Sequence, residues 1–181
     1  MSNILLNSLK EYYSDKTKQT KLIDILNNNN EVSLRIIDWF VTNYSKKYNV
    51  MYFINGDSFS LENSPSSKLF NVYYSYKTQL KSYSKKKFDP FCRRDRIQFK
   101  LGEHDIVSTI GQLNFFKWAI NNHILEYIIM NYKSIENDMN ISYNNINKKK
   151  NKDVRKKRQE ISKSATRGLN TYNVKVLIDF D

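Results

Sequence analysis

The spacing of apolar residues over the first fifty positions is helical. Apolar side chains within 4–13, and again around 22–26, recur at intervals of three and four, which predicts two short helices. The asparagines at 27–30 predict a loop after them, because Asn favours caps and turns over helix interiors. A longer helix is predicted over 34–48. Its apolar stripe consists of Leu34, Ile37, Val41, Tyr44 and Tyr48.

The next segment has the signature of a β-hairpin. Residues 50–54 are rich in strand-forming side chains and precede Asn55-Gly56, a pair that tolerates the positive φ angles of a tight turn. Residues 58–61 supply the returning strand. Over 70–80, strand-like alternation and a helical face overlap, and we interpret the segment as a strand that runs into a helix.

A second hairpin is predicted near 96–107, where apolar and polar residues alternate. The inward set is Ile97, Phe99 and Leu101, and the outward set is Arg96, Gln98 and Lys100. The outward positions make this a basic sheet face. Residues 174–180 alternate in the same way and predict a terminal strand that completes the sheet.

Two helices joined by a tight turn are predicted between the second hairpin and about 132. Ser108 or Thr109 stands where an N-cap belongs, and Asn121-Asn122 breaks the apolar periodicity between the two helices. We interpret the pair as a packing hairpin rather than a helix-turn-helix reader, because few of its exposed positions are basic.

These elements predict one α+β domain over 1–181, with a small antiparallel sheet packed against several helices. Residues from about 137 to 167 are polar, rich in Asn and Lys, and poor in large apolar side chains, so we expect a mobile basic loop there. The strand expected at 174–180 would hold that loop at both ends.

The composition allows a sizeable core and excludes several classes of protein. Of the 181 residues 40% are hydrophobic, including 13 Tyr and 10 Phe, which bury much area per residue. The single cysteine, Cys92, has no disulfide partner. The sequence has only two histidines, His104 and His123, so a Cys/His zinc site would lack ligands. The first residues do not read as a secretory signal, and apolar runs are too short to span a membrane. The four glycines are isolated, so no phosphate-binding loop is predicted, and we expect no cofactor and no metal.

The net charge of +12 is concentrated in two segments. Residues 81–100, the first basic segment, have eight basic and two acidic side chains, and 148–167, the second basic segment, have ten and two. These segments carry +6 and +8, so the rest of the chain is slightly acidic. The candidate phosphate-binding residues are Lys85, Lys86, Lys87, Arg93, Arg94, Arg96, Lys148, Lys149, Lys150, Arg155, Lys156, Lys157, Arg158, Lys163 and Arg167.

Crowded cations favour a polyanionic partner, because binding to phosphates relieves their mutual repulsion and releases condensed counterions. The alternative is that both segments are solvated and serve solubility or localisation. The arginines favour the first interpretation, since a planar guanidinium suits bidentate phosphate contacts. Aromatic side chains alternate with the cations in and before the first segment, as they do in proteins that bind single strands by base stacking. The alternative is that these rings are buried in the core. They are Tyr73, Tyr74, Tyr76, Tyr83, Phe88 and Phe91.

Two weaker patterns bear on catalysis. Asp89 followed by Gln98 and Lys100 has the spacing of a degenerate metal-dependent nuclease pattern, in which the carboxylate helps to hold Mg²⁺. Such matches are frequent in Lys-rich chains, and no second acid stands at the usual place. Cys92 precedes two arginines that could lower its pKa, but its apolar neighbours favour a buried structural thiol.

Three stretches carry a resemblance to known proteins. FDPFCRRDRI at 88–97, STIGQLNFFKWAI at 108–120 and the segment 156–181 together resemble a family of small, functionally undescribed proteins of nucleocytoplasmic large DNA viruses, of the mimivirus and phycodnavirus kind. The resemblance carries no active site. It implies expression in the host cytoplasm, in a viral factory or virion, where replication, transcription and packaging of DNA employ basic proteins.

The sequence therefore predicts a non-enzymatic protein that binds nucleic acid, DNA or RNA, through phosphate contacts from both basic segments. Two alternatives remain at this point. One is a virion or assembly protein that docks an acidic protein partner, and the other is a metal-dependent nuclease.

Overall fold

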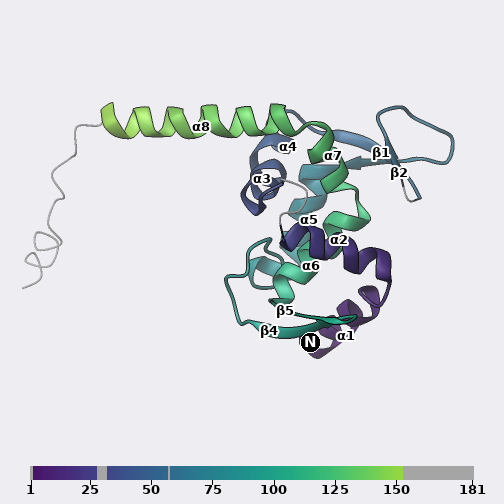
Figure 1. The fold of residues 1–181 in the computed structure, drawn as a ribbon. Helices are drawn as coiled ribbons and strands as arrows, with labels where there is room; N and C mark the ends of the chain where they lie inside the picture. Colours follow the sequence, from purple (N-terminus) through teal and green to yellow (C-terminus); the bar gives the residue numbers. More distant parts are fainter. Residues whose placement is uncertain (1, 28–31, 57, 153–181) are drawn as a thin grey trace, which may run out of the picture. The chain divides into compact units, whose positions relative to one another are not determined.

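The computed structural model describes residues 2–27, 32–56 and 58–152 (Figure 1). Residues 1–141 form one compact unit and 142–181 form another. In the second unit the described part is the helical stretch 142–152. Within the described residues, no helix is both long and apolar enough to cross a membrane.

The N-terminal half of the first unit begins with helices, as expected from its apolar spacing. In chain order they are α1 (Ser2–Tyr12), α2 (Lys16–Leu26), α3 (Leu34–Trp39), the π-helical turn η1 (Phe40–Tyr44) and α4 (Ser45–Lys47). The Asp15 carboxylate caps α2 by accepting a hydrogen bond from the backbone N–H of Thr17 at 2.8 Å. The helix predicted over 34–48 forms from Leu34 to Lys47, but the wider turn of η1 was not predicted, and Tyr48, the last residue of the predicted stripe, is 52% exposed.

The two predicted hairpins are present, and each belongs to a separate small antiparallel sheet. The first has the order β2-β1-β3, from β1 (Met51–Asn55), β2 (Ser58–Ser60) and β3 (Lys68–Asn71), and the second pairs β4 (Ile97–Leu101) with β5 (His104–Ser108). Asn55 is still within β1, so the turn begins at Gly56, one residue later than predicted. Gly56 and Gly102 have φ of 56° and 62°, which explains why glycine suits both turns.

The remaining helices are α5 (Val72–Lys87), α6 (Ile110–Asn121), α7 (Ile124–Met130) and α8 (Tyr132–Lys152). α5 directly follows β3, which confirms the expected strand that runs into a helix. α6 is the central helix of the core: most of its side chains are buried, and it contacts α1, α2, α5 and α7. Thr109 caps it by accepting a hydrogen bond from the Gln112 N–H at 3.1 Å. The α+β class is confirmed.

The prediction of a loop from about 137 was wrong for residues 137–152, because they belong to α8. Its first turns are stabilised by tertiary packing that the polar composition does not reveal, since Ile135 is fully buried and Met139 nearly so. The rest of the expected loop, 153–167, and the expected strand at 174–180 lie outside the described residues.

Candidate nucleic-acid interface

The first basic segment runs from the end of α5 to β4 and is anchored on α6. The Asp89 N–H donates to the Gly111 carbonyl at 3.2 Å. The Gln112 amide donates to the Pro90 carbonyl, and the Asn114 amide to the Lys87 carbonyl, each at 2.9 Å. Two of the stretches that carry the resemblance, 88–97 and 108–120, are therefore joined in space, and the backbone that bears the cations is fixed.

Gly111 permits this close approach. A Cβ atom there would stand 3.1 Å from the Lys86 carbonyl oxygen and 3.4 Å from the Phe88 nitrogen. Both neighbours are backbone atoms, which yield less easily than a side chain. The position of the lysines at the end of α5 thus depends on a glycine that lies far from them in sequence.

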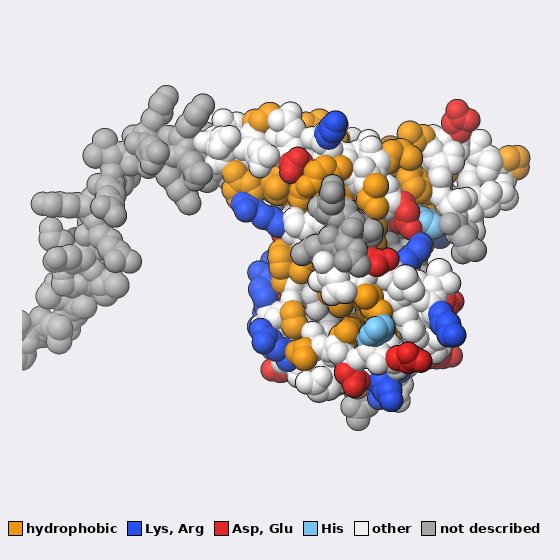
Figure 2. Space-filling view, in the orientation of Figure 1, with side chains coloured by type: hydrophobic (Ala, Val, Ile, Leu, Met, Phe, Trp, Pro, Cys, Tyr) orange, Lys and Arg blue, Asp and Glu red, His pale blue; other side chains and the backbone are white. Residues whose placement is uncertain are grey.

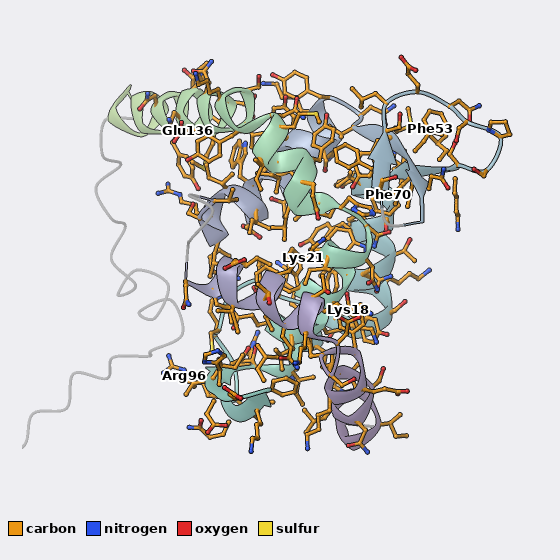
Figure 3. All side chains as sticks on the ribbon, turned by 45° about the vertical axis from the view of Figure 1, so that its right-hand side comes forward. Lys18, Lys21, Phe53, Phe70, Arg96 and Glu136 are labelled. Atoms are coloured by element: carbon orange, nitrogen blue, oxygen red, sulfur yellow. The ribbon has the colours of Figure 1, made fainter. Side chains whose placement is uncertain are left out.

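Most cations of the first basic segment face solvent. Exposed side chains are Lys81, Lys85, Lys86, Arg93, Arg94, Arg96 and Lys100, and Lys87 is half-buried. Figure 2 shows Lys and Arg side chains along the left edge of the lower half, beside the chain that leads into β4 in Figure 1. Arg96 is labelled at that edge in Figure 3, apart from Lys18 and Lys21 of α2. For Lys85, Lys86, Arg94 and Arg96, no salt bridge to another described residue is found.

Arg93 differs from its neighbours because Asp89 neutralises it. The Arg93 guanidinium donates to both carboxylate oxygens, with Nε–Oδ2 and Nη2–Oδ1 distances of 3.2 and 3.0 Å, and it lies 4.5 Å from the centre of the Phe91 ring. These hydrogen bonds raise the pKa of Arg93 further above its ordinary value. Arg93 is held in place and contributes little free positive charge.

The outward face of β4 is also less basic than its own sequence implies. The alternation is confirmed, since Phe99 and Leu101 are buried while Gln98 and Lys100 are exposed. However, Lys100 lies opposite Asp105 on β5. Cross-strand neighbours of opposite charge offset one another. The uncompensated charge is therefore at the end of α5 and around Arg94 and Arg96.

The aromatic side chains of this region divide between core and surface. Tyr76 and Phe88 are buried and pack against Trp118, so they are unavailable for base stacking. Tyr83 is half-buried, and its ring is nearly parallel to that of Phe88, at 18° and 6.4 Å. Phe91 lies under Arg93, Tyr73 is half-buried, and Tyr74 is 68% exposed.

The structure places a second acid near Asp89 that the sequence pattern did not indicate. Burial, and then repulsion from Asp89, raise the pKa of Asp38, while Arg93 and Lys85 partly offset this effect. Asp89 is already bonded to Arg93 and accepts from the Phe91 N–H at 3.1 Å. Among the described residues, no group of three or more His, Cys, Asp or Glu side chains is placed to hold a metal ion. Cys92 is a half-buried free thiol.

The second basic segment falls largely outside what the structure describes. Residues 148–152 belong to α8, but their side chains are not described, and 153–167 lie beyond the described residues. The sequence also missed the surface residues of α1, such as Ile4, that lie beside the first basic segment. No pattern in an amphipathic helix indicates which apolar residue is left uncovered.

Comparison with known proteins gives the family. Residues 1–152 match the model of a family of unknown function, DUF7197. The uncharacterized protein L507 of Acanthamoeba polyphaga mimivirus is 37% identical over 167 residues, which cover 88% of this chain and 61% of the relative. The chain thus spans less than two thirds of that protein's length. No solved structure matches. The resemblance to proteins of large DNA viruses is confirmed, and the chain belongs to the DUF7197 family.

Proposed function

We propose that this viral protein binds nucleic acid without sequence preference and without catalysis, through phosphate contacts from the first and second basic segments. The observation that carries the proposal is the exposure of cations between Lys81 and Arg96 on a backbone fixed by α6. A rigid array of unpaired cations binds phosphates with little loss of backbone freedom. The first basic segment lies within the part of the chain that matches the family, whereas the second extends past residue 152.

Salt dependence tests the proposal directly. Fluorescence anisotropy with a labelled 20-nucleotide strand and a labelled 20-base-pair duplex would measure affinity between 50 and 200 mM salt. If about six phosphates are neutralised, affinity should fall by roughly a thousandfold over that range, because each contact releases condensed cations. Binding that is absent, or that is insensitive to salt, would refute the proposal.

Charge reversal locates the contacts. The variant with Lys85, Lys86, Arg94 and Arg96 each changed to Glu should lose most of its affinity. A matched control reverses four exposed lysines outside the basic segments: Lys10, Lys16, Lys68 and Lys133. Both variants change the net charge equally, so an equal loss of affinity in both would indicate a general charge effect and not a site.

A second candidate function is docking of a protein partner during virion assembly. The observation that favours it is an exposed apolar patch at the end of α7, where Ile129 and Met130 are 50% and 66% exposed beside a pocket of about 370 Å³. Co-purification of a viral protein that survives nuclease treatment, and that Met130→Lys abolishes, would favour docking over nucleic-acid binding.

A further inference from the structure

A pocket of about 510 Å³ is lined by residues of α1 and by residues between 82 and 87 at the end of α5, which belong to the first basic segment. Its apolar lining comes from Ile4, Leu5 and Tyr83, and its polar lining includes Lys86 and Lys87. Ile4 is 75% exposed, so this wall presents an apolar side chain to solvent. The volume is within the usual range for pockets that take small organic groups.

The backbone at this pocket is strained. Ser84, another lining residue, interrupts α5 with φ of 58° and ψ of 167°, a conformation that residues other than glycine rarely adopt. The kink allows Lys85, Lys86 and Lys87 to leave the regular path of α5 while Phe88 enters the core. Strained residues of this kind persist where the surrounding structure holds them, which is frequent at ligand-binding positions.

The pocket combines an aromatic ring with cations. The half-buried Tyr83 lines the pocket, and its ring also packs nearly parallel to that of Phe88, at 18° and 6.4 Å. The Lys86 and Lys87 side chains line the same pocket, and the exposed Lys81 and Lys85 belong to the same segment. An apolar recess rimmed by cations complements a group that is flat and apolar but linked to anions. A nucleotide within a strand has this character, because its base stacks on aromatic rings while its phosphates pair with lysine.

We infer that this pocket receives one unpaired base of a single strand, with Tyr83 as the stacking platform and Lys86 and Lys87 as contacts to the adjoining phosphates. The inference rests on the proposed function and adds a preference for single strands. In a duplex both faces of each base are already stacked on neighbours, so the base has to leave the helix to enter. Stacking is tolerant of sequence, because every base has a π-face.

The test compares two strands of equal charge. A 20-nucleotide oligothymidine and a 20-residue abasic strand carry the same phosphates, and anisotropy would measure the affinity of the wild-type protein for each at one salt concentration. The oligothymidine should bind about tenfold more tightly or better, the size expected for stacking of a single base. Tyr83→Leu and Ile4→Gln should each remove most of this advantage and leave the affinity for the abasic strand unchanged.

Ile4→Gln and the control Phe53→Leu show whether a loss of base preference comes from misfolding. Tyr83→Leu removes a ring that packs on Phe88, whereas Ile4→Gln alters a side chain that is largely exposed and should not affect stability. Phe53→Leu, a half-buried ring on β1, is the matched control and should keep the preference for bases.

The outcomes separate the two proposals. Equal affinity for the two strands, or a base preference that survives both pocket variants, overturns the base pocket while phosphate binding stands. Absence of salt-sensitive binding to either strand overturns the proposed function together with the pocket.

Discussion

The Asp89 carboxylate holds the Arg93 guanidinium through two hydrogen bonds, at 3.0 and 3.2 Å. Arg93 remains 64% exposed at its side chain, but Asp89 is mostly buried. The pair stabilises the turn between α5 and β4, and it removes one cation from the candidate interface. Arg94 and Arg96, which lie on either side of Asp95 in sequence, are exposed and form no salt bridge with another described residue, so their charge stays available for phosphates.

We therefore expect Arg94 and Arg96 to contribute mainly to nucleic-acid binding and Arg93 to contribute mainly to stability. Arg94→Gln combined with Arg96→Gln should weaken nucleic-acid binding and reduce the slope of log affinity against log salt by up to about two. Arg93→Gln should change that slope by less than half as much. It should instead lower the free energy of unfolding by about 1 kcal/mol, because Asp89 loses its partner but part of the loss is regained from solvent.

Anisotropy across a salt series and urea unfolding would measure the two effects. If Arg93→Gln reduces the salt slope as strongly as the double variant does, then Asp89 does not neutralise Arg93 in solution, and the interface includes the whole run of arginines.

The nuclease alternative makes a distinct prediction about Asp89. Its carboxylate already accepts hydrogen bonds from Arg93 and from the Phe91 N–H, so coordination of Mg²⁺ would require these bonds to break. We expect no Mg²⁺-dependent cleavage of single- or double-stranded substrates by the wild-type protein. Cleavage that EDTA and Asp89→Ala both abolish would show that a nuclease site forms there, despite the observed hydrogen bonds.

The elements that sequence patterns predicted well are those whose residues alternate or recur with local periodicity. The helical segment that starts at Leu34, the two hairpins and the Thr109 cap are examples. α8 was missed over 137–152 because its composition has low helix propensity and few large apolar residues. Its first turns are held by distant partners, chiefly Trp39, which hydrogen-bonds to Asp138 at 3.0 Å. Long-range pairing of this kind leaves no local pattern.

The candidate site was predictable in its charge but not in its geometry. The exposure of Lys85, Lys86, Arg94 and Arg96 follows from the cost of burying charge. Neutralisation of Arg93 and burial of Tyr76 depend on contacts made by the folded chain. The same holds for the pocket at Tyr83, since one of its walls comes from residues of α1 near the N-terminus.

The half-buried Asp38, near the Asp89–Arg93 pair, offers a route to greater stability. Burial, followed by repulsion from Asp89, raises the pKa of Asp38, so its ionised form destabilises the fold at neutral pH. Asp38→Asn should therefore raise the free energy of unfolding at pH 7 by about 0.5–1 kcal/mol. A carboxyl with a raised folded pKa costs nothing below the unfolded value of about 4, so the gain should vanish near pH 3.

Thermal or urea unfolding of both proteins at pH 3 and pH 7 would measure this gain. A loss of stability at pH 7 would mean that the Asp38 carboxylate makes a favourable ionic contact, and a gain of equal size at both pH values would point to packing and not to charge.

The close contact at Gly111 predicts that its replacement by Ala destabilises the protein, the opposite of the usual effect for a glycine within a helix. Replacement of Gly by Ala within a helix ordinarily stabilises by up to about 1 kcal/mol. Here the new methyl group would meet the Lys86 carbonyl and the backbone at Phe88. Backbone shifts of this kind cost about 1–3 kcal/mol, so Gly111→Ala should destabilise on balance. Urea unfolding measures the change, and Lys133→Ala at an exposed helical site is the control. A stabilised Gly111→Ala variant would show that the end of α5 is free to move.

Asp138 joins the start of α8 to the helices near the N-terminus and predicts a dependence of stability on pH. It accepts hydrogen bonds from the Trp39 indole at 3.0 Å, from the Tyr48 hydroxyl at 3.1 Å and from the Lys47 ammonium. Burial alone would raise the pKa of Asp138, but these three donors together lower it below its ordinary value. The ionised carboxylate therefore stabilises the folded state.

Asp138→Asn should lower the free energy of unfolding at pH 7 by about 2 kcal/mol, because a buried, charge-assisted set of hydrogen bonds is lost. A depressed folded pKa contributes stability above the unfolded value of about 4 and loses it as pH falls through the folded value. The difference between wild type and variant should accordingly shrink below pH 4. Urea unfolding from pH 7 to pH 2.5 measures it, with Glu136→Gln on the same helix as a control expected to change stability by less than about 0.5 kcal/mol. A difference that stays constant across this range would mean that the variant acts through packing, and that the charge of Asp138 does not secure α8.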